Sequence, residues 1–425
     1  MSDAPFHKTT LPNGLRVLAA PMPHTRSVAV SVYVGAGSRY EAPEQAGLSH
    51  FIEHLCFKGT ERRPTPQEVF QVIDGIGGTI NAATDRELTV FYCKVARPHL
   101  ELALDVLADL VRRPIFEPEE LEKERRVVME ELAMVADSPG QQVDVLLDET
   151  IWPGQPLGRD VAGSDASVSA LSREQALAYL SHQYVPNNVV VSIAGSIDAR
   201  QAVQLVDEAF GDWARGVPGG WYPAVNGQRA PRISLREKPS EQAHLSLAVR
   251  GLPLTHPDRY ALSLLSTVLG EGMSSRLALE LRERRGLCYD VHSYLSVYQD
   301  AGAFAVYAGV DPASAKEALG ALVAELARVR DEDVPEDELE RAKELAKGRL
   351  LLRMEDTRAV SDWLGAQALL TNRLRTADEV AGLIDAVTPE AMRQVASRLF
   401  VTEQLNLAVV GPFKSDRRFR PMLKL

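Results

Sequence analysis

The sequence is poor in the features that mark several large classes of protein. Its 425 residues include only 3 cysteines and no Cys-x-x-Cys pair, which argues against a disulfide framework and against a cysteine-ligated zinc site. No apolar run approaches the roughly 18 residues that a membrane helix needs. Residues 1–17 have neither the basic nor the apolar segment of a secretory signal. These absences predict a protein of the reducing cytoplasm with no membrane partner.

Basic residues are also outnumbered. The 47 Lys and Arg residues against 58 Asp and Glu residues give a formal net charge of −11. Binding to a phosphate backbone requires a basic surface, so we expect no nucleic-acid partner. The acidic balance is compatible with attraction of basic peptides, although solubility alone explains it equally well.

The second half of the sequence repeats the pattern of the first half. A chain of 425 residues is too long for one ordinary domain. AHLSLAVRGL follows the pattern of SVAVSVYVG, AGAFAVYAGV that of LTVFYCKV, VPEDELERAKE that of FEPEELEKERR, and LNLAVVGPF that of VVVSIAGSI. Because all four similarities occur in the same order, they predict a duplicated domain.

The composition changes between the two halves. Residues 214–232 are rich in Gly and Pro and lack hydrophobic periodicity, so they are the best candidate for a linker. We therefore expect an N-terminal domain over residues 1–213 and a C-terminal domain over residues 233–425. The predicted fold class is α+β, with two homologous α/β-sandwich repeats, each a mostly antiparallel mixed sheet packed by helices.

The pentapeptide HFIEH lies in a segment, residues 46–57, that reads as a helix. Positions four apart are neighbours on one helix face, so His50 and His54 can bind one metal ion. Glu53 lies beside both histidines and can take a proton from a water molecule. A polar edge on an amphipathic helix explains these five residues equally well.

A second helical segment places carboxylates where apolar residues are expected. Residues 118–136 have a stripe with helical spacing, formed by Leu121, Glu124, Val128, Glu131 and Val135. Buried carboxylates are costly unless they are paired or bind a metal ion. The stripe therefore offers the third protein ligand that a catalytic zinc site needs. The alternative is a charged surface helix with an accidental stripe.

Together, GLSHFIEHLCFKGT and ERRVVMEE resemble the motifs of the pitrilysin/insulinase metallopeptidases, the inverzincins with an HxxEH motif. The subgroup that looks most similar is that of mitochondrial processing peptidase and its bacterial relatives. By this resemblance His50, His54 and Glu131 match the ligands of one zinc ion per chain. Glu53 matches the general base. Glu124 matches a second carboxylate that supports the site.

The resemblance extends along essentially the whole chain. Residues 11–17 look like the opening strand of the family. In residues 77–95 two glycines precede an extended run that matches an edge strand, to which a substrate peptide adds as another strand. Asn81 and Ala82 match the positions that contact the peptide. An ordinary strand after a glycine turn is the alternative.

The second half has no HxxEH motif, and Arg349 stands near the position that corresponds to Glu131. It contains instead LRERRGLCY, with Arg282 and Tyr289 seven residues apart. This segment is similar to the one from which the family brings an Arg/Tyr pair to the active site. By that resemblance Arg282 binds a substrate carbonyl and Tyr289 donates to the developing oxyanion.

The resemblance implies a zinc-dependent endopeptidase that cleaves peptides or unfolded segments inside a closed chamber. Longer relatives carry four repeats in one chain, so a chain with two repeats is expected to act as a homodimer. Arg282 and Tyr289 of one copy would then serve the zinc of the other copy. Alternatives are a non-catalytic core subunit of the cytochrome bc1 type and a peptide-binding protein with a vestigial site. A complete set of ligands plus a base favours the enzyme.

Overall fold

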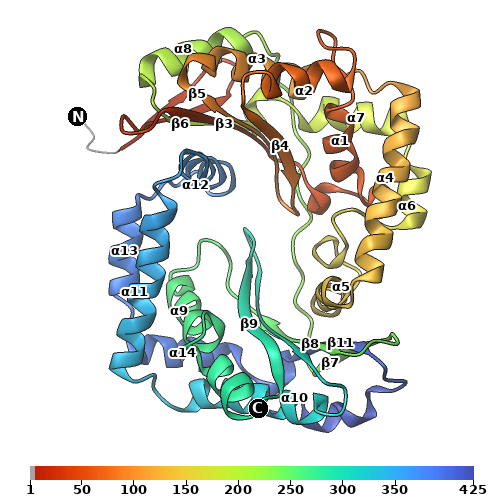
Figure 1. The fold of residues 1–425 in the computed structure, drawn as a ribbon, viewed down its shortest axis with the longest axis vertical. Coiled ribbons are helices and arrows are strands. Elements are labelled where there is room, and N and C mark those ends of the chain that lie inside the picture. The colour runs from red at the N-terminus through yellow and green to blue at the C-terminus, as the bar shows by residue number, and fades with distance from the viewer. Residues whose placement is uncertain (1–4) are drawn as a thin grey trace. The chain divides into compact units, whose positions relative to one another are not determined.

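The computed structural model describes residues 5–425, which form two compact units (Figure 1). The first unit comprises the chain up to Leu132 together with Asp160–Tyr222 and Leu351–Ala377. The second unit comprises Ala133–Arg159, Pro223–Leu350 and Asp378–Leu425. Each unit is a sheet with helices packed on it, as the α+β prediction requires.

The first unit contains a six-stranded sheet in the order β1-β2-β6-β3-β5-β4. Neighbouring strands are antiparallel except β2 and β6, which are parallel. The strands are β1 His7–Thr10, β2 Arg16–Pro21, β3 Ser27–Val34, β4 Thr79–Thr84, β5 Thr89–Ala96 and β6 Val189–Gly195. Strand β4 therefore forms one edge of this sheet.

The helices of the first unit cover both faces of its sheet. Alternate side chains of a strand point to opposite faces, so Val30 and Val32 of β3 join the large core, whereas Tyr33 joins a smaller cluster on the other face. The helices are α1 Leu48–Cys56, α2 Pro66–Asp74, α3 Leu100–Arg112, α4 Pro118–Asp137, α6 Asp165–Ala170, α7 Arg173–Gln183, α8 Ala199–Phe210 and α12 Thr357–Leu370. Helix α12 packs on the face with the smaller cluster, against β3 and β6.

The second unit contains a five-stranded sheet in the order β7-β11-β8-β10-β9. Its strands are β7 Arg232–Glu237, β8 Ala243–Arg250, β9 Cys288–Val297, β10 Gly302–Val310 and β11 Asn406–Gly411. Its helices are α5 Pro139–Ile151, α9 Arg259–Gly270, α10 Ala315–Asp331, α11 Glu336–Arg353, α13 Ala377–Asp385 and α14 Pro389–Leu399. A π-helical turn, Ala278–Arg284, precedes β9.

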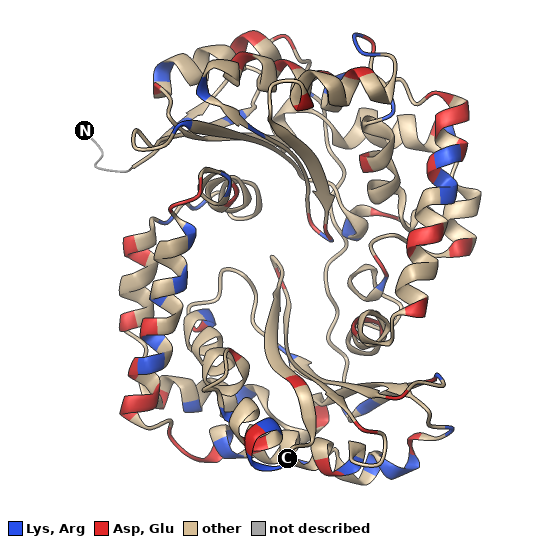
Figure 2. Ribbon diagram, viewed as in Figure 1, with Lys and Arg blue, Asp and Glu red and all other residues tan. Residues whose placement is uncertain are grey.

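The two sheets confirm the duplication predicted from the sequence. The order β2-β6-β3-β5-β4 in the first unit corresponds to β7-β11-β8-β10-β9 in the second unit. Strand directions correspond as well, because the parallel pair β2–β6 has its counterpart in the parallel pair β7–β11. Helix α4 and its counterpart α11 both carry charged residues of both signs (Figure 2). The expected mixed sheets are thus present in both repeats.

Each unit also includes a helix from the other half of the chain. Helix α5 packs on β8 and β11, and helix α12 packs on β3 and β6. A tyrosine of the sheet holds each helix, because Tyr294 donates to Asp144 at 3.1 Å and Tyr33 donates to Asp362 at 2.7 Å. Because each compact unit is built from separate stretches of the chain, the units do not coincide with the predicted domains. The boundaries 1–213 and 233–425 remain a proposal for the extent of the two homologous halves.

Most predicted elements match the structure, but the expected opening strand at residues 11–17 is wrong in its first five positions. Residues 11–15 form a turn in which Gly14 has a φ of 88°, and strand β2 begins only at Arg16. The Asn13 carboxamide accepts from the Leu15 N–H at 3.1 Å and donates to the Phe210 carbonyl at 2.7 Å. The sequence Pro-Asn-Gly favours a turn, and the chain forms this turn where the family resemblance predicted the start of a strand.

Residues 213–231, which include most of the predicted linker, contain no helix or strand. No helix among residues 5–425 combines the length and the apolar composition that crossing a membrane requires.

Candidate metal centre

Helix α1 carries HFIEH, and its N-terminus is fixed by a distant carboxylate. Gly47 at the N-cap has a φ of 93° and offers no capping side chain. The fully buried Glu41 accepts hydrogen bonds from the backbone N–H groups of Gly47 at 2.9 Å and Ser49 at 2.7 Å. These bonds satisfy donors that a helix leaves open at its start. The buried side chains Leu48, Phe51, Ile52 and Leu55 then anchor α1 in the core.

The structure brings His50, His54 and Glu131 together. The Nε2 atoms of His50 and His54 are 3.3 Å apart. From α4, Glu131 Oε2 lies 3.8 Å from His50 Nε2 and 3.6 Å from His54 Nε2. A ligand atom from each of these three side chains lies within 4.8 Å of the other two, and among residues 5–425 this is the group of His, Cys, Asp or Glu side chains that could hold a metal ion. We call these three side chains the metal group.

These distances fit a tetrahedral zinc ion. Bonds of about 2.1 Å at tetrahedral angles place ligand atoms about 3.4 Å apart, close to the three separations observed. Three protein ligands also leave the fourth position open, as catalytic zinc sites do. His50 Nδ1 is buried and without a hydrogen-bond partner among the described residues. The donor set is therefore suited to zinc in chemistry and in spacing.

The two histidines have opposite pKa shifts. Burial, with a smaller contribution from His54, lowers the pKa of His50 to about 4, so His50 is neutral at pH 7. Burial also opposes the charge on His54, but the hydrogen bond to Glu124 and the charge of Glu131 raise the pKa of His54. A metal ion binds the neutral imidazole, so binding at Nε2 of His54 would displace the second proton of the charged form.

Glu124 contacts His54 on the side of the ring that faces away from the metal group. Its side chain is only 6% exposed, and Oε2 lies 3.0 Å from His54 Nδ1. Its other oxygen, Oε1, lies 2.8 Å from Lys58 Nζ. Burial alone would raise the pKa of Glu124, but the hydrogen bonds to His54 and Lys58 lower it. An ionised Glu124 keeps the proton of His54 on Nδ1 and leaves Nε2 free to bind a metal ion.

Replacing Lys58 with methionine is expected to weaken zinc binding by about 10-fold or more, as loss of outer partners of a metal ligand does elsewhere. Without Lys58, the buried Glu124 loses the cation that stabilises its charge. The measurement is a competition titration of the metal-free protein with a zinc chelator. Lys123→Met is the matched control, because Lys123 pairs with Glu120 on the surface of α4. Equal affinities of both variants would contradict this role of Lys58.

Glu53 lies beside the ligand group without belonging to it. Its Oε2 accepts a hydrogen bond from Thr84 Oγ1 at 2.5 Å. Burial raises the pKa of Glu53, although the hydrogen bond from Thr84 opposes the shift. A carboxyl group with a raised pKa near an open ligand position is suited to accept and return a proton.

Asn81 and Ala82 lie on β4, the edge strand predicted from the sequence. Asn81 pairs with Tyr92 of β5 and is exposed, whereas Ala82 pairs with Phe91 and is buried in the core. Strand β4 is the last strand in the sheet order. The structure therefore confirms the edge strand, whereas the contact of these residues with a peptide stays a prediction.

Arg282 and Tyr289 meet each other in the second unit. The guanidinium carbon of Arg282 lies 4.8 Å from the centre of the Tyr289 ring, and Tyr289 is 78% exposed. Arg282 is in the π-helical turn, and Tyr289 is the second residue of β9. All the predicted metal-site residues belong instead to the first unit.

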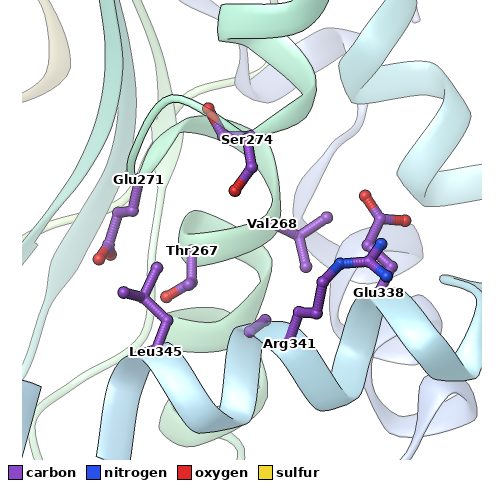
Figure 3. A pocket seen from close by; sticks show the side chains of 9 residues that line it. Thr267, Val268, Glu271, Ser274, Glu338, Arg341 and Leu345 are labelled. Atoms are coloured by element: carbon purple, nitrogen blue, oxygen red, sulfur yellow. The ribbon is translucent and has the colours of Figure 1, made fainter. Parts of the chain in front are cut away.

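The second repeat has no comparable metal group among its described residues. Arg349, near the position that corresponds to Glu131, forms an ion pair with Glu271 at 2.5 Å. Ala342, seven residues before Arg349 as Glu124 is before Glu131, contributes to a pocket between α9 and α11 (Figure 3). The other lining residues are Thr267, Val268, Glu271, Ser274, Ser275, Glu338, Arg341 and Leu345. The second repeat has therefore kept the counterpart of α4 without its carboxylate ligand.

Three site residues were not predicted from the sequence: Glu41, Lys58 and Thr84. The spacing of four residues from His54 to Lys58 was a possible signal, but α1 ends at Cys56, so helix periodicity does not apply. Glu41 and Thr84 reach α1 from other elements. No pattern in the sequence indicates those contacts.

Two sequence profiles of one peptidase family match the chain. The profile described as insulinase (peptidase family M16) matches residues 16–165. The profile described as peptidase M16 inactive domain matches residues 170–345. The metal group lies within the first match.

Curated relatives are similar along nearly the whole chain. The uncharacterized zinc protease YmxG of Bacillus subtilis is 36% identical over 405 residues, which cover 95% of this chain and 97% of the relative. The uncharacterized zinc protease ML0855 of Mycobacterium leprae is 37% identical over 423 residues, which cover 98% of this chain and 94% of the relative.

Solved structures share the fold. A protease from Helicobacter pylori superposes with a TM-score of 0.90 at 24% identity and covers 96% of this chain and 99% of its own. A peptidase M16 inactive domain from Pseudomonas fluorescens superposes with a TM-score of 0.86 at 21% identity, and the match covers 96% of this chain and 99% of that structure's chain.

Proposed function

The chain belongs to the insulinase family, peptidase family M16, and from that premise we propose that it is a zinc-dependent endopeptidase. It would hydrolyse peptide bonds in peptides or unfolded segments. The observation that carries the proposal is the spacing of the ligand atoms of His50, His54 and Glu131, with Glu53 beside them. Two curated relatives that cover nearly the whole chain are named zinc proteases.

The residues of this chain divide the reaction among them. His50, His54 and Glu131 would hold one zinc ion, which when bound would serve as a Lewis acid and lower the pKa of a water molecule toward about 7. Glu53 accepts the proton of the attacking water and returns it to the leaving amine. Glu124 and Lys58 keep His54 oriented. The Tyr289 hydroxyl donates to the oxyanion, and Arg282 binds a substrate carbonyl.

The substrate would lie extended along β4. Backbone pairing to an edge strand makes few demands on side chains, so many sequences can bind. The exposed Asn81 would contact the peptide, and Ala82, whose side chain is buried, would contact it through its backbone. The residues that would hold zinc, the base and the edge strand all belong to the first unit.

We further propose that the active form is a homodimer that closes a chamber around the peptide. Each chain supplies two repeats. Arg282 and Tyr289 are both far from fully buried, which leaves them free to meet a second copy. In this arrangement the Arg/Tyr pair of one copy completes the zinc site of the other copy.

Mixing two inactive variants tests this sharing. Arg282→Ala and Glu53→Gln chains are each expected to be nearly inactive alone. A mixed dimer has one site with both an intact Glu53 and an intact Arg282, so about a quarter to a half of wild-type activity should return, depending on how the chains assort. Peptide cleavage is measured after subunit exchange has been verified by mass. Exchanged mixtures that stay inactive would contradict sharing between copies.

A non-catalytic assembly subunit is the second candidate function. Core subunits of the cytochrome bc1 type are similar in fold, and a vestigial peptide-binding protein would also keep the edge strand. Here every predicted ligand and the base are present and adjacent, which favours the enzyme.

We also propose that the protein is cytoplasmic. All three cysteines are free thiols in the part of the chain that the structure describes, as expected in a reducing compartment.

A further inference from the structure

The end of the edge strand is joined directly to the candidate base. Thr84 is the last residue of β4, and its hydroxyl donates to Glu53 Oε2 at 2.5 Å. Glu53 has no part in the metal group. The carboxylate that must deprotonate the water is therefore held by the last residue of the strand.

The Thr84 hydroxyl is itself fixed by its neighbours. Thr84 pairs with Thr89 across the β4–β5 hairpin, and their Oγ1 atoms lie 3.3 Å apart. The fully buried Thr89 donates its hydroxyl to the Ala36 carbonyl at 3.1 Å. With Thr89 donating to Ala36, Thr89 can accept from Thr84 but need not donate to it, which is consistent with donation from Thr84 to Glu53. The contact to the base thus rests on the sheet and not on a mobile side chain.

The same strand would also set the register of the substrate. Asn81 and Thr84 are three residues apart, which corresponds to about 10 Å along an extended strand. A peptide paired to β4 and the carboxylate of Glu53 would both be located by one rigid element. A small shift of a base relative to the scissile bond can cost about 100-fold in rate.

We propose that Thr84 is a positioning residue that links peptide docking on β4 to the orientation of Glu53. This inference deepens the proposed peptidase function and rests on it. Thr84 is not one of the metal ligands, and its hydroxyl is bonded to Glu53, so its effect passes through Glu53. The hydroxyl is the atom that matters, which makes threonine and serine equivalent and valine defective.

The test compares Thr84→Val, which keeps the shape of the side chain, with Thr84→Ser, which keeps the hydroxyl. For the valine variant we expect kcat to fall about 10- to 100-fold with KM, bound zinc and Tm unchanged. The serine variant should retain at least a third of kcat. Thr9→Val on β1, at the opposite edge of the sheet, is the matched control. If the valine variant does not fold, Thr84→Ala takes its place.

A binding measurement separates positioning of the base from integrity of the strand. In a zinc-loaded Glu53→Gln background, which cannot cleave, adding Thr84→Val should change peptide affinity less than threefold. Wild-type kcat in Thr84→Val would overturn the inference, and so would a large loss of affinity in the Glu53→Gln background. The proposed function itself fails by a different result. If the wild-type protein shows no cleavage that a chelator stops, the peptidase proposal is wrong. If the wild type is active and the valine variant is equally active, only the role of Thr84 is wrong.

Discussion

Replacing Glu53 with glutamine is expected to abolish peptide cleavage while zinc stays bound. Glutamine keeps the size of the side chain and can still accept a hydrogen bond from Thr84, but it cannot accept a proton. General-base catalysis contributes about 10²- to 10⁴-fold, so kcat should fall by at least the lower figure. The three metal ligands are untouched. The measurement pairs cleavage of a fluorogenic peptide with zinc content per chain.

The control for this variant is Glu44→Gln, because Glu44 is an exposed glutamate that precedes α1. It should match the wild type in both measurements. A Glu53→Gln protein that carries zinc and keeps more than a tenth of the wild-type kcat would refute the base assignment. Loss of zinc together with activity would instead place Glu53 among the ligands.

Replacing Glu131 with alanine is expected to remove zinc and activity together. Two histidines alone leave zinc with an incomplete protein ligand set. The loss of affinity should exceed the roughly 10- to 100-fold that accompanies loss of an outer partner. Because the Glu131 side chain is 43% exposed, the metal-free fold should lose little stability. Zinc content after dialysis and Tm without metal are the two readouts.

Glu130→Ala is the matched control for Glu131→Ala. Glu130 is the preceding residue of α4 and is exposed, so its removal should affect neither zinc nor cleavage. Tight zinc binding by the Glu131→Ala chain would contradict the proposed ligand set. In that case a carboxylate outside the group would have to be the third ligand.

The metal group could be predicted because its signals are local. His50 and His54 are four residues apart on one helix, and Glu124 and Glu131 occupy apolar positions of another helix. Leu121, Glu124 and Val128 of that stripe are indeed buried. Glu131 is half-buried, as expected for a residue at the rim of a site that a peptide must reach. The duplication was predictable for a similar reason, since strand patterns recur in one order.

The supporting contacts could not be predicted, because they depend on tertiary structure. Glu41 caps α1 across a turn, Lys58 meets Glu124 beyond the end of a helix, and Thr84 reaches Glu53 from the end of a strand. The exchange of α5 and α12 between the repeats escaped prediction as well. An amphipathic pattern shows that a helix face is buried, but it does not show against which sheet.

Arg282 and Tyr289 stay a prediction of a different kind. The resemblance to the family motif selected them, and the structure places them in contact with each other. Their contact with substrate depends on a second copy of the chain. The mixing experiment described above is therefore the direct measurement of their role.

The most direct test of the peptidase proposal is digestion of a graded peptide library, with the products identified by mass. Wild-type protein loaded with zinc should cleave internal bonds of extended peptides. A chelator should stop cleavage, added zinc should restore it, and the Glu53→Gln protein should leave the library intact under all conditions. Cleavage that survives complete removal of metal, or an untouched library with zinc bound, would contradict the account.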